Sequence, residues 1–128
     1  RQLARVRPDL VRRVITLGTP VIGGPKYTIV AHLYRRRGLD IEAIAAEVDA
    51  RNQTPLLVPV TAIYSSIDAI VAWQACIDST GAAVEHVEVR TTHLGFGFSP
   101  EVYEIIAGRL ALDSMEMIQA ANQGTPSS

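Results

Sequence analysis

The sequence lacks the features that mark several specialised classes of protein. It has one cysteine, Cys76, which excludes an internal disulfide. No apolar run approaches the roughly 18 residues that a membrane-spanning helix needs. Neither sign of charge is in excess, because 12 lysine and arginine residues stand against 13 acidic ones. Since a nucleic-acid footprint needs a clear basic excess, we expect no nucleic-acid partner. Since no apolar run is long enough, we also expect no membrane span.

The sequence also lacks a targeting segment and a cofactor motif. It opens with Arg1–Arg7, which is typical of the last turns of an amphipathic helix and not of a signal peptide. We therefore expect a cytoplasmic protein whose true amino terminus lies upstream. Gly95-x-Gly97 does not follow the kind of segment that precedes a phosphate cradle. Because the acids and histidines show no metal-ligand spacing, we expect no metal and no cofactor. The groups considered as ligands are Asp68, Asp78, His86 and His93.

What the sequence does contain is an alternation of strand-like and helix-like segments. Apolar residues make up 48% and charged residues 20%, which suits one globular domain with a sizeable core. Strands that alternate with helices indicate an α/β fold with a parallel sheet. We expect strands over Val11–Leu17, Leu56–Tyr64 and Val84–Val89. We expect helices over Arg1–Arg7, Tyr27–Arg37, Ile41–Asn52, Ile70–Ile77 and Ser99 to about Leu112, and a loose tail over Gln119–Ser128.

Prolines and capping residues indicate where these segments begin and end. Pro8 ends the first helix, because proline lacks an amide donor and disfavours helical geometry in the residue before it. Asp40 and Ser99–Glu101 are good helix starts. Pro59 falls inside an expected strand, which favours an edge or a bulge at that point. The loop Val21–Pro25 contains two glycines and a proline.

Polar residues follow all three expected strands. The first strand ends at Gly18–Pro20, the second is followed by Ser65–Asp68 and the third by Thr91–His93. Parallel strands place these ends at one edge of the sheet, where the functional groups of such folds gather. Asp68 and His93 should therefore lie on neighbouring loops. A carboxylate beside an imidazole fixes its tautomer and stabilises the imidazolium, which is the arrangement that activates a serine or cysteine nucleophile.

Other residues are weaker candidates for that chemistry. Asp78 could replace Asp68 as the acid, but it should point away from the strand edge. Ser65 and Ser66 lack the flanking glycines of a strained elbow that exposes a hydroxyl. Cys76 lies in an apolar stretch that favours a buried thiol. His86, within a strand, is expected to be structural or solvent-facing, and His32 to be exposed.

Two further features have a functional and a structural interpretation. Trp73 either lines a substrate pocket near the acid loop or belongs to the core, and the core is the commoner place for such a residue. The run Arg35–Arg37 is either a solvated helix end or a contact for a phosphate or a partner. The solvated helix end is the interpretation we favour.

Three segments together resemble the carboxyl-terminal half of an α/β-hydrolase of the lipase/esterase kind. "PDLVRRVITLGTP" (Pro8–Pro20) is similar to the segment after the family's nucleophile helix. "VPVTAIYSSIDAIV" (Val58–Val71) is similar to its acid loop, and "VEVRTTHLGFGFSPEV" (Val87–Val102) to its histidine loop. The resemblance implies a partial α/β-hydrolase fold with a parallel sheet of about three strands. It covers residues 1–112, with a helical cap-like insertion over 27–52, and leaves 113–128 as a helix end and flexible tail.

The resemblance also implies an Asp68–His93 pair from a Ser-His-Asp triad, without its serine. The family's Gly-x-Ser-x-Gly elbow is absent, and no serine precedes Ser65. One hypothesis is that the chain is a fragment of a serine hydrolase that acts on an ester or related acyl substrate, inactive by itself. The alternative is a non-catalytic truncated module that self-associates or binds a partner. In either case we expect a homodimer through the open edge of the strand Val11–Leu17.

Overall fold

The computed structural model describes residues 1–23, 26, 28, 31–81 and 83–123. Parts of the expected loop Val21–Pro25, of the expected helix Tyr27–Arg37 and of the expected tail lie outside these residues. The elements are α1 (Gln2–Val6), β1 (Val14–Leu17), α2 (Ala31–Arg36), α3 (Ile41–Asn52), β2 (Val60–Tyr64), β3 (Val84–Glu88) and α4 (Pro100–Gln123). Short 3₁₀ turns occupy Pro8–Leu10, Trp73–Cys76 and Leu94–Gly97.

The three strands form a parallel sheet in the order β1-β2-β3, which confirms the expected α/β fold class. Val14 pairs with Val60, and Val60 with Val84, so the strands begin level with one another. The strands are shorter than expected, because β1 begins at Val14 and β2 at Val60. Pro59 stands just before β2, where its missing N–H breaks no ladder bond, and its carbonyl accepts from the Val14 amide at 2.9 Å.

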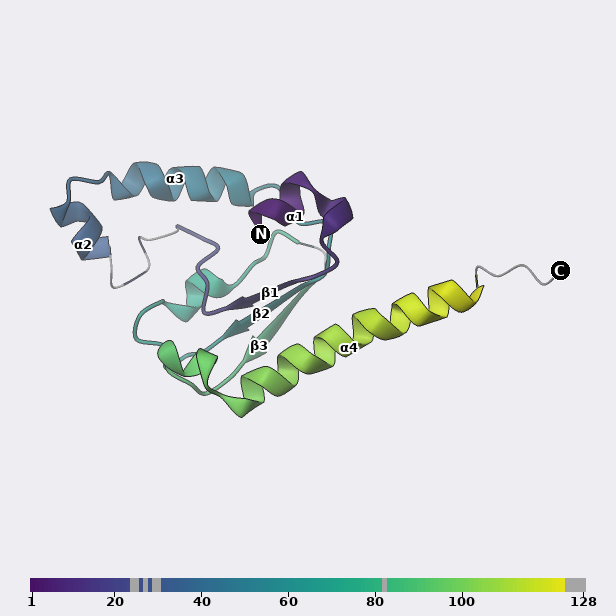
Figure 1. Cartoon of the computed structure of the whole chain (residues 1–128). Helices are drawn as coiled ribbons and strands as arrows, with labels where there is room; N and C mark the ends of the chain where they lie inside the picture. The colour runs from purple at the N-terminus through teal and green to yellow at the C-terminus, as the bar shows by residue number, and fades with distance from the viewer. Residues whose placement is uncertain (24–25, 27, 29–30, 82, 124–128) are drawn as a thin grey trace.

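Helices cover both faces of the sheet, as Figure 1 shows, with α4 on one side and α1 and α3 on the other. The alternation of side chains along each strand explains the two layers. One cluster joins Ala4 of α1 to Val14 and Val60. The other joins Val102 of α4 to Ile63 of β2. Each buried side chain adds about 1.5–3 kcal/mol of burial free energy, so these two clusters hold the helices against the strands.

The helix α4 begins as its sequence predicts and ends later. Ser99 precedes it, and the Ser99 carbonyl accepts from the Tyr103 amide at 3.2 Å. The expectation that it ends near Leu112 is wrong, because α4 continues to Gln123 and projects beyond the sheet (Figure 1). The added residues are rich in Ala, Met, Glu and Gln, which have high helix propensity, and contain no proline or glycine. The expected loose tail over Gln119–Ser128 is therefore wrong for Gln119–Gln123, which belong to α4, and residues 124–128 lie outside the described part.

The expected helix Ile70–Ile77 is also wrong, because only a 3₁₀ turn forms, over Trp73–Cys76. The amides of Ile70 and Val71 donate to the Asp68 carboxylate, and Val71 also forms an isolated antiparallel bridge with Thr28. These contacts fix the first residues in a turn. The bridge keeps the backbone at Val71 extended, so no helix runs through this residue.

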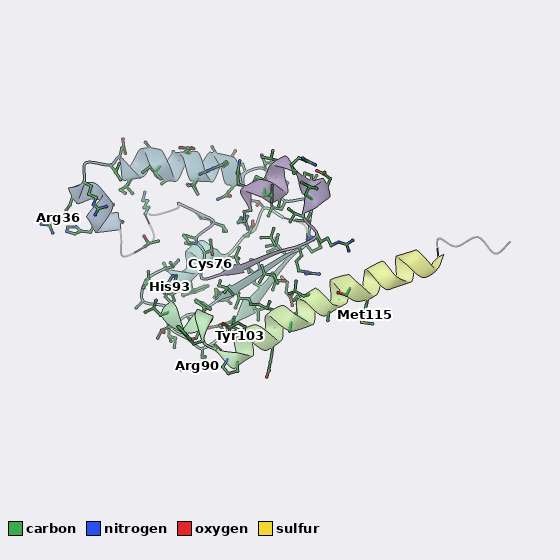
Figure 2. All side chains as sticks on the ribbon, in the orientation of Figure 1. Arg36, Cys76, Arg90, His93, Tyr103 and Met115 are labelled. Carbon is green, nitrogen blue, oxygen red and sulfur yellow. The ribbon has the colours of Figure 1, made fainter. Side chains whose placement is uncertain are left out.

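Of the two helices between β1 and β2, α3 agrees with the sequence, whereas α2 is shorter than the expected Tyr27–Arg37, since it spans Ala31–Arg36 and Thr28 lies in a bridge. α3 spans Ile41–Asn52, and the Asp40 carboxylate caps it by accepting from the Ala43 amide at 3.0 Å. Arg35 and Arg36 end α2 with exposed side chains, and Figure 2 shows Arg36 pointing away from the sheet. Their exposure fits a solvated helix end and equally a contact for a phosphate or a partner. The Asn52 side-chain amide donates to the Val21 carbonyl and so ties α3 to the loop after β1.

Candidate active site

The loops after β2 and β3 bring Asp68 and His93 into contact at the carboxyl end of the sheet. Oδ2 of Asp68 lies 2.7 Å from Nδ1 of His93. Only 2% of the Asp68 side chain is exposed, whereas 31% of the His93 side chain is exposed. Figure 2 shows His93 at this end of the sheet. The acid is therefore enclosed, while the imidazole remains open to a reactant.

The Asp68 carboxylate is held on both oxygens. Oδ1 accepts from the amides of Ile70 at 2.8 Å and Val71 at 3.0 Å, while Oδ2 faces the imidazole of His93. Burial alone would raise the pKa of the Asp68 carboxyl. The hydrogen bonds from His93, Val71 and Ile70 outweigh burial, so the pKa is lower than its ordinary value. Asp68 is therefore an ionised hydrogen-bond acceptor at neutral pH.

His93 is oriented for proton transfer at its second nitrogen. An ionised carboxylate only accepts hydrogen bonds, so Nδ1 carries the proton when the ring is neutral and Nε2 carries the lone pair. Within the described residues, Nδ1 has a hydrogen-bond partner and Nε2 has none. The ring meets the edge of Phe96 with centroids 6.1 Å apart, and Phe96 is buried. Nε2 can thus accept a proton from a reactant, with Asp68 stabilising the imidazolium.

Gly18 completes the site from the end of β1. It has a φ of +50°, in the left-handed region, and its amide donates to the Ile63 carbonyl at 2.9 Å. A Cβ built on Gly18 would stand 3.0 Å from Oδ2 of Asp68 and 3.2 Å from Nδ1 of His93. It would also stand 2.7 Å from Cε2 of Phe96. Glycine at this position therefore permits the Asp68–His93 contact, a role that the sequence indicated only as a strand break.

The nucleophile candidates within the chain do not fit the role. Ser65 is buried, with 1% exposed, and its Oγ accepts from two backbone amides. Ser66 is exposed and follows β2 without the glycines of an elbow. Burial, and secondarily the charge of Asp68, raise the pKa of the Cys76 thiol to about 11. A thiol with that pKa is neutral at physiological pH, so Cys76 is a poor nucleophile.

The other acid and histidines considered for the site bind other partners or face solvent. Asp78 is buried and accepts from Arg1 and from the Thr80 hydroxyl, so it does not serve His93. His86 is exposed on β3, and its Nε2 accepts from the Asp78 amide at 3.0 Å. That bond gives His86 a structural role. His32 is exposed, as expected.

Trp73 is not the core residue that the sequence favoured. It is 38% exposed and stacks on Tyr64, with ring centroids 5.9 Å apart. Both rings line a hollow of about 110 Å³ together with Ser66 and Glu88. A larger hollow of about 410 Å³ lies along the 3₁₀ turn after the acid loop, lined by Ile22, Ala72, Gln74 and Ala75.

Other kinds of site find little support in the described part of the chain. No group of three His, Cys, Asp or Glu side chains among the described residues is arranged to hold a metal ion. No described helix combines the length and the apolar character needed to cross a membrane.

Comparison of the chain with protein-family models, with curated proteins and with solved structures finds no match. The interpretation of the site therefore depends on its own geometry.

Proposed function

We propose that the chain carries the acid and the base of a serine hydrolase that acts on an ester or related acyl substrate. The observation that carries this proposal is the 2.7 Å contact between Asp68 and His93 at the carboxyl ends of parallel strands. His93 takes the proton of a serine hydroxyl at Nε2 as the oxygen attacks the acyl carbon. It then returns that proton to the leaving group, and Asp68 stabilises the imidazolium between the two steps.

The serine of this triad lies outside the 128 residues. The sequence has no Gly-x-Ser-x-Gly elbow. Ser65 and Cys76 are buried, and Ser66 lacks the flanking glycines of an elbow. In the family that the sequence resembles, the acid follows one parallel strand and the histidine a later one. Asp68 after β2 and His93 after β3 have this order. By itself, the chain should not turn over esters.

The proposal extends to the fold. We take residues 1–112 as the carboxyl-terminal part of an α/β-hydrolase domain, with residues 27–52 as a helical insertion beside the substrate entrance. The tie from Asn52 of α3 to Val21, in the loop after β1, supports that placement. The hollow of about 410 Å³ lined by Ile22 and Ala75 has a volume that suits a small acyl group.

An esterase assay with matched histidine variants tests the enzyme proposal. The 128-residue chain alone should hydrolyse p-nitrophenyl butyrate no faster than buffer. If the gene encodes a Gly-x-Ser-x-Gly elbow upstream of Arg1, the protein that includes it should hydrolyse this ester, and His93→Ala should reduce its kcat by about 10⁴-fold or more. His86→Ala is the matched control, because His86 lies outside the site and should leave kcat unchanged. Turnover that persists in His93→Ala would show that His93 is not the base.

A second candidate function is assembly through β1, and the contrast between the two sheet edges favours it. The β3 edge carries exposed Glu88, a charge that discourages strand pairing, and Glu85, which is ion-paired with Arg109 of α4. β1 carries no charge and, within the described residues, pairs only with β2. In α1 and the turn that follows it, Leu3, Val6 and Leu10 are all more than half exposed. A second copy that pairs β1 with β1 would cover this edge and give a symmetric homodimer.

Light scattering with two substitutions at one position tests this assembly. The amides of Val14 and Gly18 donate to β2 or the residues beside it, so the alternating Ile15 amide faces the open edge. Ile15→Pro removes that donor, whereas Ile15→Ala shortens the side chain and keeps it. We expect twice the 13.9 kDa chain mass for the natural sequence and Ile15→Ala, and the single mass for Ile15→Pro. A natural chain that is monomeric at micromolar concentration would contradict the dimer.

A further inference from the structure

Ser65 occupies the point where the acid loop and the histidine loop meet. It is the first residue after β2, and only 1% of it is exposed. Its Oγ accepts from the Ile67 amide, one residue before Asp68, at 3.3 Å. The same Oγ accepts from the Thr91 amide, two residues before His93, at 3.3 Å. One buried hydroxyl oxygen therefore joins both loops next to the groups that they carry.

We propose that Ser65 is a positioning residue, whose hydroxyl fixes the distance between Asp68 and His93. This inference rests on the proposed hydrolase only for its catalytic consequence, since the contact that it concerns exists in this chain. Ser65 neither touches a substrate nor supplies the nucleophile. It acts through the backbone amides of Ile67 and Thr91.

The backbone alone does not lock this relationship. Backbone hydrogen bonds join β2 to β3 along the strands. The last of these bonds runs from the Val89 amide to the Tyr64 carbonyl, at 2.9 Å. Beyond that bond, within the described residues, the link between the two loops on the way to the site is the Ser65 hydroxyl. The bond from the Asp68 amide to the Ser65 carbonyl closes the acid loop on itself and does not reach the histidine loop.

Removal of the hydroxyl leaves two amides without an acceptor. In Ser65→Ala, the Ile67 and Thr91 amides must find water, which requires the loops to separate. A wider separation weakens the bond from His93 Nδ1 to Asp68. Because that bond selects the Nδ1–H tautomer of the neutral ring, its weakening returns population to the Nε2–H tautomer.

The ¹⁵N chemical shifts of the His93 ring in the 128-residue chain measure this directly, at a pH where the ring is neutral. We expect the natural chain to hold the Nδ1–H tautomer. In Ser65→Ala, the ratio of Nδ1–H to Nε2–H should fall by about fivefold, the factor that corresponds to loss of one ordinary hydrogen bond. Ser66→Ala is the matched control, because Ser66 is the exposed neighbour and should leave the ratio unchanged.

A second control separates positioning from a general loss of stability. Val60 is buried at the opposite end of β2, so Val60→Ala destabilises the sheet without touching either loop. The ratio in Val60→Ala should match that of the natural chain. An unchanged ratio in Ser65→Ala, or an equal fall in Val60→Ala, would overturn the positioning role. A natural chain without the Nδ1–H tautomer would instead refute the Asp68–His93 pair and the proposed hydrolase with it.

Discussion

The carboxylate of Asp68 reaches the imidazole of His93 at 2.7 Å across a sequence separation of 25 residues. The groups that hold this pair are backbone amides, a glycine and a buried hydroxyl, all within the chain. Asp68 and His93 are therefore held together by groups of this chain alone. The consequences of this arrangement for stability and reactivity are measurable in the isolated chain.

The Asp68 carboxylate should stabilise the fold in a manner that depends on pH. Its folded pKa lies below the ordinary value of 3.8, so its contribution is fully present above that pH. The contribution disappears as the pH falls through the lower folded pKa. We expect Asp68→Asn to reduce the free energy of unfolding by about 2 kcal/mol at pH 7, since it weakens hydrogen bonds to a charged group. Urea titrations between pH 7 and pH 3 should show this difference shrinking below about pH 4.

The control for Asp68 is an aspartate in an exposed ion pair. Asp9 accepts from Arg7 on the surface, where solvent and salt screen the charges. Asp9→Asn should leave the free energy of unfolding nearly unchanged at every pH. A difference for Asp68→Asn that persists undiminished in acid would contradict the assignment of a lowered pKa.

Gly18 and Gly38 form a matched pair for the space beside the candidate site. Both have left-handed φ angles, +50° and +75°, so alanine adds a similar backbone cost of about 1–2 kcal/mol at each. A Cβ on Gly38 meets nothing within 4 Å, whereas one on Gly18 meets Phe96, Asp68 and His93. We expect Gly18→Ala to lower the free energy of unfolding by at least about 1 kcal/mol more than Gly38→Ala. Equal losses of unfolding free energy in urea titrations would show that the site rearranges to accommodate the added methyl group.

The Cys76 thiol should be unreactive in the folded protein. Its pKa of about 11 leaves almost no thiolate at pH 8, and the residue is 3% exposed. Ellman's reagent should modify it slowly in native buffer and rapidly in urea. The same result excludes a disulfide-linked dimer as the cause of any self-association. Fast modification of the native protein would contradict the burial of this thiol.

Two apolar residues of α4 should differ sharply in their effect on stability. Val102 is 0% exposed and packs under the sheet with Phe96 of the histidine loop. Leu112 is 48% exposed and stands three residues before Met115, which Figure 2 shows on the part of α4 that extends past the sheet. Val102→Ala should cost about 2 kcal/mol through lost burial and a cavity, whereas Leu112→Ala should cost less than about 0.5 kcal/mol. Thermal melts of both variants measure the difference, and a larger loss for Leu112→Ala would mean that this end of α4 is covered.

Much of the fold follows from local patterns. The β-branched runs gave strands at the expected places, the Asp40 carboxylate caps α3, and Ser99 stands just before α4. The expected helix Ile70–Ile77 did not form, because Val71 pairs with Thr28 in an isolated antiparallel bridge and only Trp73–Cys76 make a 3₁₀ turn. That bridge joins two residues far apart in the sequence, so a local pattern contains no trace of it.

The sequence by itself determined the order of strands and helices, and with it that Asp68 and His93 would arrive at one edge of a parallel sheet. Hydrophobic periodicity is a local property that sets the order of the elements. Parallel strands then place their carboxyl ends at the same edge of the sheet. Only the tertiary structure decided which acid meets which histidine, and that Gly18 and Ser65 shape the contact. Asp68 and Asp78 look alike in sequence, but one accepts from His93 and the other from Arg1. Such choices depend on distances of a few ångströms between loops remote in sequence, which only packing sets.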